Sequence, residues 1–392
     1  MTIIKQVGIL GGTFNPIHNA HIQMALDAKS EFNLDEVILL LSPLPPHKQQ
    51  NSITNKIHRF EMVKLAANEH SLNFSDVEMN REGTTYTIDT LKILKEQNKD
   101  CEFFYIIGSD TLKDLKNWKS IDQVLKLTKF ICFCRDNSTI ADNIEYINNN
   151  FNDDKQQILF SSTVQQPISS TFIRDELKKE NNISPLVSHS VYEYILQYAL
   201  YSKDFEVYDS IRKQVETMIN QKRMQHTLNV VYSAILLAQR FNKNVSDSRF
   251  AALLHDCAKD IPFGESIKML NRWDIDPTDY YEFPKTLHAA VGAQIAKYQF
   301  HMDENIVNAI YVHTTGAKEM NSLDKIIYLA DVIEKNRSFK GVEKLRQLAE
   351  NSLEDAFFAA LNRKIIHLIE EDKKICLKSV QARNNMIDKR KR

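Results

Sequence analysis

The sequence predicts two domains of different class: a doubly wound α/β domain with a parallel sheet, followed by an all-α helical bundle. Up to about residue 200, short apolar runs with few charges alternate with segments of helical periodicity, a pattern typical of βαβ units. After Tyr201 no convincing strand pattern follows, and amphipathic helix patterns take over. The length of 392 residues also suits two domains of about 150–200 residues.

The strands expected in the first half are short runs that are apolar on both faces, as in a parallel sheet covered by helices. These runs are 7–10, 36–42, 102–108, 129–134 and 157–161. The intervening segments 19–32, 56–70 and 87–97 carry helical periodicity.

The second half shows helical periodicity in 206–221, 223–241, 247–258, 287–299, 304–313, 322–335 and 341–372. We place the domain boundary in "ALYSKDFEVYD" (199–209), which gives domains at 1–201 and 205–375. The remainder, 376–392, is a basic C-terminal tail whose end, 383–392, is expected to be frayed and solvated.

Composition is that of a soluble globular protein, with 43% apolar and 26% charged residues. A net charge of −1 gives no electrostatic reason to expect nucleic acid or a membrane as a partner. Five cysteines without a paired framework suit a reducing compartment. The N-terminus lacks a signal-peptide pattern, and no run of 18 apolar residues exists, so we expect a cytoplasmic protein. The sequence leaves a homo-oligomer open.

The string "VGILGGTFNPIHNAH" (7–21) predicts a strand, a Gly-Gly turn and a helix starting near Ile17. Glycines let backbone N–H groups approach an anion, and a helix N-terminus favours negative charge at the same point. His18 and His21 are three residues apart on that first turn, so their donors converge on a polyphosphate. A plain strand-to-helix turn is the alternative, and a metal site is disfavoured because the motif brings no acidic partner.

The motif resembles the signature of nucleotidyltransferases with an (H/T)xGH sequence, although Ala20 replaces the usual glycine. The resemblance continues in order along the first half of the chain, through "PLPPHK" (43–48), "REGTTYTIDTL" (81–91), "IIGSDTL" (106–112) and "ISSTFIRDEL" (168–177). The helix expected in 188–201 also fits. This half is similar to the nicotinate-nucleotide adenylyltransferase family.

The resemblance implies transfer of an adenylyl group from ATP to nicotinate mononucleotide, giving deamido-NAD and pyrophosphate, with Mg²⁺ on the pyrophosphate. It assigns catalytic charge neutralisation to His18, His21, Lys48 and Arg174. It assigns binding of the two substrates to Gly11, Gly12, Thr13, Phe14, Thr85, Tyr86, Thr87, Gly108, Ser109, Asp110, Trp118, Arg135, Ser169, Ser170 and Thr171. Pantetheine-phosphate and glycerol-phosphate transferases share the first motif, but the TTYT loop and Trp118 argue against them. Those features favour the pyridine acid over the amide less strongly.

A second motif, "LLHDCAKD" (253–260), ends an apolar run in the helical half. Cys257 follows Asp256, and an acidic neighbour raises a thiol pKa, so we expect a packed and unreactive cysteine. His255 and Asp256 by themselves suit a capped helix end. His226, Asp331, His288 and His313, however, are also metal-ligand residue types at apolar positions of other predicted helices. In a bundle such residues converge, and a mixed His/Asp set suits Fe, Mn or Zn.

The order His226, His255-Asp256, Asp331 resembles the HD phosphohydrolase superfamily, and "HTTG" (313–316) with "MNSLDKIIYLADVIEKNRSFKGVEKLR" (320–346) resembles its symmetrical diadenosine tetraphosphate hydrolases. The resemblance implies an HD-domain bundle that splits this substrate into two ADP. Its metal, iron first with manganese or zinc as alternatives, would be held by His226, His255, Asp256 and Asp331, and Asp256 would also orient the water. His288 and His313 match positions for a second metal or phosphates, and Lys259 and Arg337 are candidate phosphate contacts.

Each motif is accompanied by the other residues of its own site, so we expect two complete sites rather than one shared site. The alternatives for the helical half are hydrolysis of another phosphoester, such as a deoxynucleotide or cyclic dinucleotide, a nucleotide-sensing module without catalysis, and a purely structural domain.

Overall fold

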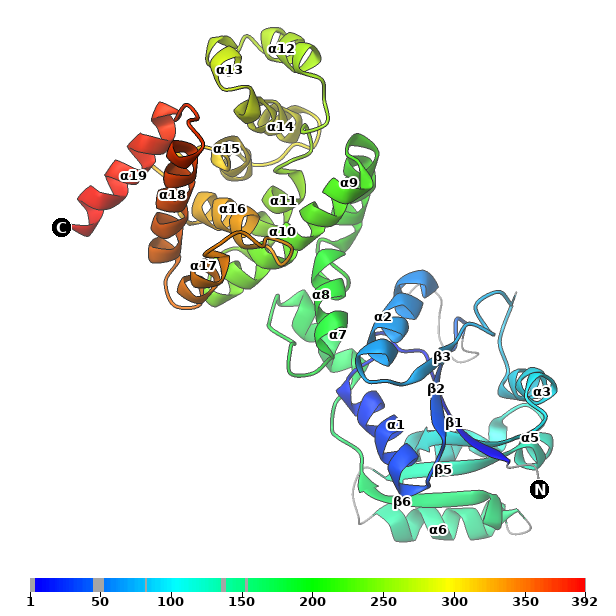
Figure 1. Cartoon of the computed structure of the whole chain (residues 1–392). Helices are drawn as coiled ribbons and strands as arrows, with labels where there is room; N and C mark the ends of the chain where they lie inside the picture. Colours follow the sequence, from blue (N-terminus) through cyan, green and yellow to red (C-terminus); the bar gives the residue numbers. More distant parts are fainter. Residues whose placement is uncertain (1–3, 45–52, 82, 135–138, 152–153, 392) are drawn as a thin grey trace. The chain divides into compact units, whose positions relative to one another are not determined.

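The computed structural model describes residues 4–44, 53–81, 83–134, 139–151 and 154–391. The chain divides into two compact units, Met1–Tyr194 and Ile195–Arg392 (Figure 1). The division falls within helix α8 (His189–Gln197), just ahead of the segment 199–209 in which the sequence places the boundary.

The first unit contains a six-stranded parallel sheet in the order β3-β2-β1-β4-β5-β6, which confirms the predicted doubly wound class. The strands are β1 (Lys5–Gly12), β2 (Glu36–Leu41), β3 (Asn73–Ser75), β4 (Cys101–Gly108), β5 (Thr128–Cys134) and β6 (Ile158–Val164). The strand order reverses between β1 and β4, and ligands of such sheets bind at the carboxyl ends of the strands beside this switch point. Strand β3 was not predicted, because it has three residues and carries no buried apolar run.

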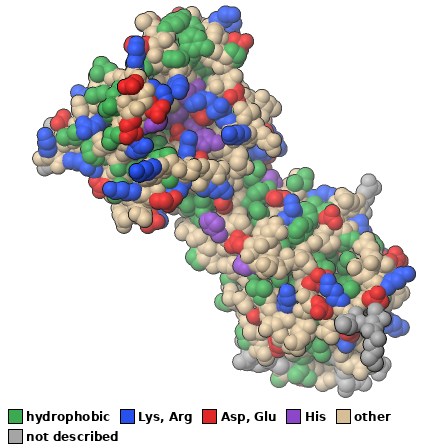
Figure 2. All heavy atoms as spheres, viewed as in Figure 1, with side chains coloured by type: hydrophobic (Ala, Val, Ile, Leu, Met, Phe, Trp, Pro, Cys, Tyr) green, Lys and Arg blue, Asp and Glu red, His purple; other side chains and the backbone are tan. Residues whose placement is uncertain are grey.

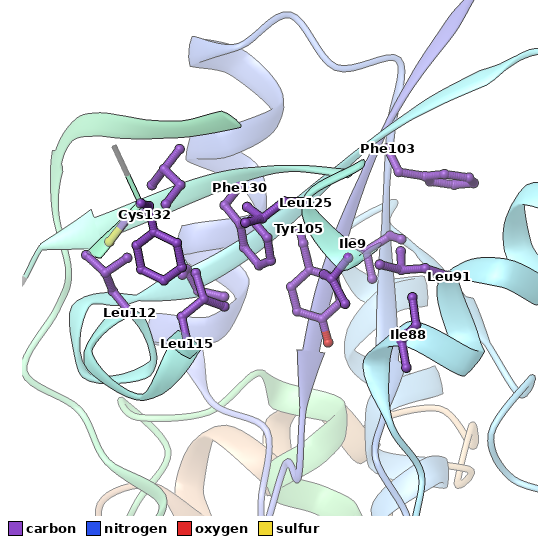
Figure 3. Close-up of a cluster of buried hydrophobic side chains, with 14 of the residues drawn as sticks. Ile9, Ile88, Leu91, Phe103, Tyr105, Leu112, Leu115, Leu125, Phe130 and Cys132 are labelled. Carbon is purple, nitrogen blue, oxygen red and sulfur yellow. The ribbon is translucent and has the colours of Figure 1, made fainter. Parts of the chain in front are cut away.

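The helices of this unit are α1 (Asn19–Glu31), α2 (Lys56–Glu69), α3 (Thr87–Gln97), α4 (Ser109–Asp114), η2 (Leu115–Asn117), α5 (Ile121–Leu127), α6 (Thr139–Asn150), η3 (Lys155–Gln157), α7 (Ser170–Lys178) and α8. One face of the sheet packs against α3 to α6, and Figure 3 shows the core there, with Tyr105 and Phe130 of the sheet among Leu91, Leu112 and Leu125 of the helices. Helices α1 and α2 pack on the strands from the other face.

The described residues of the second unit form helices and the segments that connect them, without a strand, as predicted. Its helices are α9 (Phe205–Met218), α10 (Gln221–Arg240), α11 (Val245–Leu254), α12 (Phe263–Arg272), α13 (Thr278–Glu282), η4 (Pro284–Thr286), α14 (Leu287–Tyr298), α15 (Glu304–Val312), α16 (Ser322–Ile333), α17 (Val342–Ala349), α18 (Leu353–Glu370) and α19 (Leu377–Arg390). The single helix expected over 341–372 is two helices, since Ser352 caps a new one at Leu353. Helices α12 and α13 were not predicted. In the described part of the chain, no helix combines the length and apolarity needed to cross a membrane.

The expectation that 383–392 is frayed is wrong for 383–390, because these residues lie in helix α19. Ser379, Ala382 and Met386 recur at helical spacing and are buried, and Ser379 Oγ donates to the Thr315 carbonyl at 2.8 Å. The basic residues of the tail find acidic partners, as in the 3.1 Å pair between Lys389 and Glu319. An apolar stripe therefore holds this basic helix against the bundle.

Candidate active sites

The first candidate site begins at the switch point of the sheet, where β1 ends in Gly11 and Gly12. A Cβ on Gly11 would lie 2.0 Å from the Tyr105 hydroxyl oxygen, and one on Gly12 would lie 2.8 Å from the Phe14 ring. Close packing therefore requires both glycines here. Strand β4 runs beside β1 and ends at Gly108, so the segment with Ser109 and Asp110 leaves the sheet at the same edge.

His18 and His21 lie together at the start of α1. The helix begins at Asn19 rather than near Ile17, and His18 is its N-cap with extended backbone. The two rings stack with centroids 3.6 Å apart, and the His18 backbone N–H donates to His21 Nδ1 at 3.3 Å. His18 is only 4% exposed, and its Nδ1 is buried with no hydrogen-bond partner among the described residues. Burial lowers the pKa of His18 to about 4, so the free ring is neutral.

The second signature, in α7, is bonded to the loop that precedes α1. Arg174 donates to the Asn15 carbonyl at 2.8 Å and to Thr171 Oγ1 at 3.1 Å. Ser170 Oγ donates to the Pro16 carbonyl at 2.8 Å, and the Ser169 side chain caps α7. Two motifs that are distant in the sequence therefore form one structure, with the N-termini of α1 and α7 at the same loop.

Arg59 of α2 also holds this loop, and sequence reasoning missed it. It is 1% exposed and donates to the carbonyls of Thr54 at 2.8 Å, Thr13 at 2.7 Å, Ser42 at 3.0 Å and Pro43 at 2.7 Å. Its place on the buried stripe of α2, with Met62 and Ala66, is the signal that could have identified it. The arginine joins the segments that follow β1 and β2.

A cavity of about 340 Å³ lies beside this loop and is lined by Ser42, Thr85, Tyr86, Thr87, Asn117, Trp118 and Lys119. The predicted pyridine-binding loop and Trp118 are thus brought together. Lys119 Nζ lies 4.3 Å from the centroid of the Tyr86 ring, and Trp118 packs edge-on against Tyr105 at 5.7 Å. No motif or periodic pattern pointed to Ser42, Asn117 or Lys119. Lys48 and Arg135, which the sequence places at this site, lie outside the described residues.

The second candidate site gathers side chains from five helices of the second unit. His226 lies on α10, His288 on α14 and Asp331 on α16, while His255 and His313 cap the C-termini of α11 and α15. Asp256 follows His255 in the turn after α11. Packing of α10 against α11 and α16, and of α15 against α11, α14 and α16, brings all six side chains together. Figure 2 shows histidine side chains gathered on one face of this unit, with Lys and Arg side chains around them.

Asp256 is the centre of this cluster. Its carboxylate lies 3.0 Å from His288 Nε2, 3.7 Å from the Nε2 atoms of His255 and His313, and 3.3 Å from Lys259 Nζ. Burial opposes ionisation of Asp256, but the imidazoles and Lys259 outweigh it and hold the pKa of this carboxyl well below its usual range. Burial lowers the pKa of both His255 and His288 to about 4.

The donor set fits a divalent cation. Two groups of ligand atoms each lie within 4.8 Å of one another: His226, His255 and Asp256, and Asp256, His288 and His313. His255 Nδ1 contacts the Ala252 carbonyl and His313 Nδ1 the Ile310 carbonyl, both at 2.7 Å. These contacts place the ring proton on Nδ1 and leave Nε2 as a ligand. His255 Nε2 is buried and has no hydrogen-bond partner among the described residues.

His226 connects the cluster to Asp331 and Glu334. Its Nε2 lies 3.1 Å from Asp331 and its Nδ1 lies 3.4 Å from Glu334, which is 2% exposed and also accepts from Asn229. Burial opposes protonation, but the two carboxylates raise the pKa of His226 to about 9. Sequence reasoning missed Glu334. Its spacing of three residues from Asp331 was the available signal.

A cavity of about 520 Å³ opens onto this cluster and is lined by Asn220, Lys222, Arg223, His226, Asp256, Lys259, Asp331, Glu334, Asn336 and Arg337. The predicted phosphate contacts Lys259 and Arg337 both line it, and so do Lys222 and Arg223, which the sequence did not single out. Cys257 is fully buried, and burial raises the pKa of its thiol to about 12, in keeping with an unreactive cysteine.

Residues 9–176 match the family model described as cytidylyltransferase-like. A protein from Clostridium novyi described as a probable nicotinate-nucleotide adenylyltransferase is 41% identical over 188 residues, which are 47% of this chain and 92% of that protein. A protein of the same description from Clostridium acetobutylicum is 36% identical over 202 residues, which are 50% of this chain and the whole of that protein. Through its first half, the chain belongs to the nicotinate-nucleotide adenylyltransferase family.

In this adenylyltransferase family member, residues 223–336 match the HD domain model, so the second half contains an HD domain. A crystal structure from Clostridium acetobutylicum, described as a predicted HD superfamily hydrolase involved in NAD metabolism, is 34% identical. The match covers 46% of this chain and 97% of the chain in that structure, with a TM-score of 0.45. The HD model spans His226, His255, Asp256 and Asp331.

Proposed function

We propose that the first half transfers the adenylyl group of ATP to nicotinate mononucleotide, giving deamido-NAD and pyrophosphate. The observation that carries this proposal is the adjacency of two parts: the loop at the N-termini of α1 and α7, and the cavity with Trp118 and Tyr86. Helix N-termini and imidazoles suit phosphates, and a cavity with aromatic walls suits a pyridine ring. Family membership supports the same reaction.

In this reaction a phosphate oxygen of the mononucleotide forms a bond to the α-phosphorus of ATP, and the bond between that phosphorus and the pyrophosphate oxygen breaks. His18, His21, Lys48 and Arg174 would neutralise the charge that develops on the phosphates, and the remaining binding residues would align the two substrates. We expect Mg²⁺ to enter with the nucleotide, on the leaving pyrophosphate.

The test is a turnover assay of the full-length chain with ATP, Mg²⁺ and either the acid or the amide mononucleotide. Formation of deamido-NAD and pyrophosphate in equal amounts, faster with the acid, is the expected result. Faster turnover of the amide would correct the substrate, and failure with both would contradict the proposal.

We propose that the second half is a metal-dependent phosphohydrolase that splits diadenosine tetraphosphate into two ADP. His226, His255, Asp256 and Asp331 would hold the first cation, with His288 and His313 available to a second. When bound, a cation supplies Lewis acidity and lowers the pKa of water. The observation that carries this proposal is the buried donor set, which opens onto a cavity with four cationic side chains, Lys222, Arg223, Lys259 and Arg337. Such a cavity suits a polyphosphate.

Elemental analysis of the purified chain, combined with a substrate screen, tests this half. We expect a bound transition metal, iron first and manganese or zinc otherwise, and release of ADP from diadenosine tetraphosphate. Bound metal with turnover of only a deoxynucleotide or a cyclic dinucleotide would change the substrate. A chain without metal and without turnover would favour a sensing or structural domain.

A further inference from the structure

A second cavity of the helical half, of about 420 Å³, adjoins the metal-ligand cluster. It is lined by Ala258, Lys259, Ile261, Phe263, Ser266, Pro284, Lys285, Leu287 and His288. Lys259 lines this cavity and the polar cavity described above, and His288 belongs to the cluster itself. Lys259 Nζ contacts His288 Nε2 at 2.8 Å, so the side chains that line this cavity directly border the cluster.

The two cavities have opposite chemistry. All the described residues that line the first cavity are polar or charged, and four of them are Lys or Arg. The second cavity has apolar walls formed by Ile261, Phe263, Pro284 and Leu287. Its polar lining residues are Ser266, His288 and the cations Lys259 and Lys285, and it has no carboxylate among its described lining residues. The first cavity thus suits phosphates, and the second suits an uncharged, flat group that is linked to phosphates.

Phe263 is the feature that selects the occupant. It begins α12 and remains 40% exposed, and its ring contacts Tyr281 edge-on at 5.7 Å. A nucleobase that stacks on such a ring covers apolar surface at little conformational cost, and base–aromatic stacking tolerates any base. Lys285 and Lys259 line the same cavity and can supply positive charge to a phosphate attached to the ribose.

We propose that this cavity is a nucleoside subsite: it binds the base and ribose of one half of the substrate, while the attached diphosphate runs past Lys259 to the metal-ligand cluster. The proposal rests on the proposed phosphohydrolase function and adds the place where one base of the substrate binds, stacked on Phe263. The other half of a dinucleoside polyphosphate then extends through the polar cavity.

Photolabelling of the full-length chain locates the subsite without requiring turnover. The probe is 8-azido-ADP with Mn²⁺, followed by mass spectrometry of the labelled peptides. We expect label on peptides that contain 258–266 or 284–288, in addition to any label on the first unit. Label in the second unit confined to 220–226 or 331–337 would overturn the proposal, because the base would then lie in the polar cavity.

The variant Phe263→Ala tests the energetic role of the ring, and its exposure makes the substitution tolerable for folding. We expect KM for diadenosine tetraphosphate to rise about tenfold, with kcat changed less than about threefold, since one stacked base is lost. Phe263→Trp should restore the affinity. Hydrolysis of inorganic tripolyphosphate, which has no base, should not change.

Tyr298→Ala is the matched control, because Tyr298 is a 55% exposed aromatic residue of the same half that does not line the cavity. An equal effect of both substitutions, or no effect of Phe263→Ala, would contradict the subsite. The two proposals fail separately: labelling of the cavity without hydrolysis removes the substrate assignment, whereas hydrolysis without labelling removes the subsite.

Discussion

The two candidate sites both suit phosphate chemistry, but they lie at opposite ends of helices. In the first unit, His18 caps the N-terminus of α1 and Ser169 caps that of α7. In the second unit, His255 and His313 cap the C-termini of α11 and α15. A helix N-terminus carries partial positive charge and a C-terminus partial negative charge. The first site is therefore built for an anion and the second for a cation.

The comparison teaches how a buried imidazole should be interpreted. His18 Nδ1 and His255 Nε2 are both buried and lack a hydrogen-bond partner among the described residues, which is uncommon in a folded protein and is typical of atoms that contact a substrate or a cation. Burial lowers both pKa values to about 4, so the pKa does not separate the two sites. The two sites differ in the helix end at which each histidine lies, and in the Asp256 carboxylate that lies beside His255.

The largest expected effects come from reciprocal substitutions that separate the two sites. His18→Ala should lower adenylyl transfer about 10³-fold, since it removes a donor to the developing charge, and should leave phosphohydrolysis intact. Asp256→Asn should abolish bound metal and phosphohydrolysis, and should leave adenylyl transfer intact. Both activities and the metal content are measured on each full-length variant. Loss of both activities in either variant would contradict two independent sites.

Arg59→Ala tests whether the loop of the first site depends on the guanidinium beneath it. The substitution leaves four backbone carbonyls without this donor and opens a cavity beside α2. The free energy of unfolding should therefore fall by about 3–5 kcal/mol. The midpoint temperature of unfolding and the rate of adenylyl transfer should both fall, while metal content is retained. Arg59→Lys should recover part of the stability. Unchanged unfolding and unchanged transfer would show that the loop holds its form without this residue.

Glu334→Gln tests the contact that orients His226, a proposed ligand of the second site. A carboxylate on the far nitrogen of a metal-binding imidazole fixes its orientation, so we expect a 10–100-fold loss of metal affinity. Competition with a chelator measures this affinity directly. Glu319→Gln, on a residue that is 72% exposed, is the control and should change nothing. Equal affinities of the two variants would limit Glu334 to packing.

Prediction from the sequence succeeded where a motif or a periodic pattern carries the information. The parallel sheet, the helical bundle and the convergence of His226, His255, Asp256 and Asp331 all followed from such patterns. Arg59 and Glu334 were missed because their roles depend on tertiary contacts with backbone carbonyls or with another helix. Strand β3 was missed because three residues give no periodicity.

The end of the chain shows a different kind of failure. Charge dominated the interpretation of 383–392, although Ser379, Ala382 and Met386 form a buried stripe at helical spacing. Charged side chains on the outer face of a helix say little about whether its inner face is packed.

The pKa of His18 predicts a pH effect that distinguishes the anion site from the cation site. The folded-state pKa of about 4 lies below the ordinary 6.5, so the unfolded chain binds a proton that the folded chain excludes between these values. Stability of the first unit should therefore fall as the pH falls through this window.

A phosphate beside the His18 ring raises the pKa of the ring, so binding of ATP near pH 6 should take up a proton. Calorimetry in two buffers of different ionisation enthalpy measures the uptake, which His18→Asn should abolish. Equal uptake in both proteins would assign the proton to another group.

The smallest effect is expected at Cys257, which follows Asp256 in the sequence but takes no part in the proposed metal binding or hydrolysis. Its sulfur faces the packed core beside Gly292, 3.5 Å from where a Cβ on that glycine would lie, and burial raises the pKa of the thiol to about 12. Cys257→Ala should retain metal content and phosphohydrolysis within about twofold and destabilise the bundle by about 1 kcal/mol, because a small buried group is removed. Metal analysis, turnover and denaturant unfolding check these values. Loss of metal in this variant would place the sulfur among the ligands, and the helix C-termini and the Asp256 carboxylate would then not be enough to define the cation site.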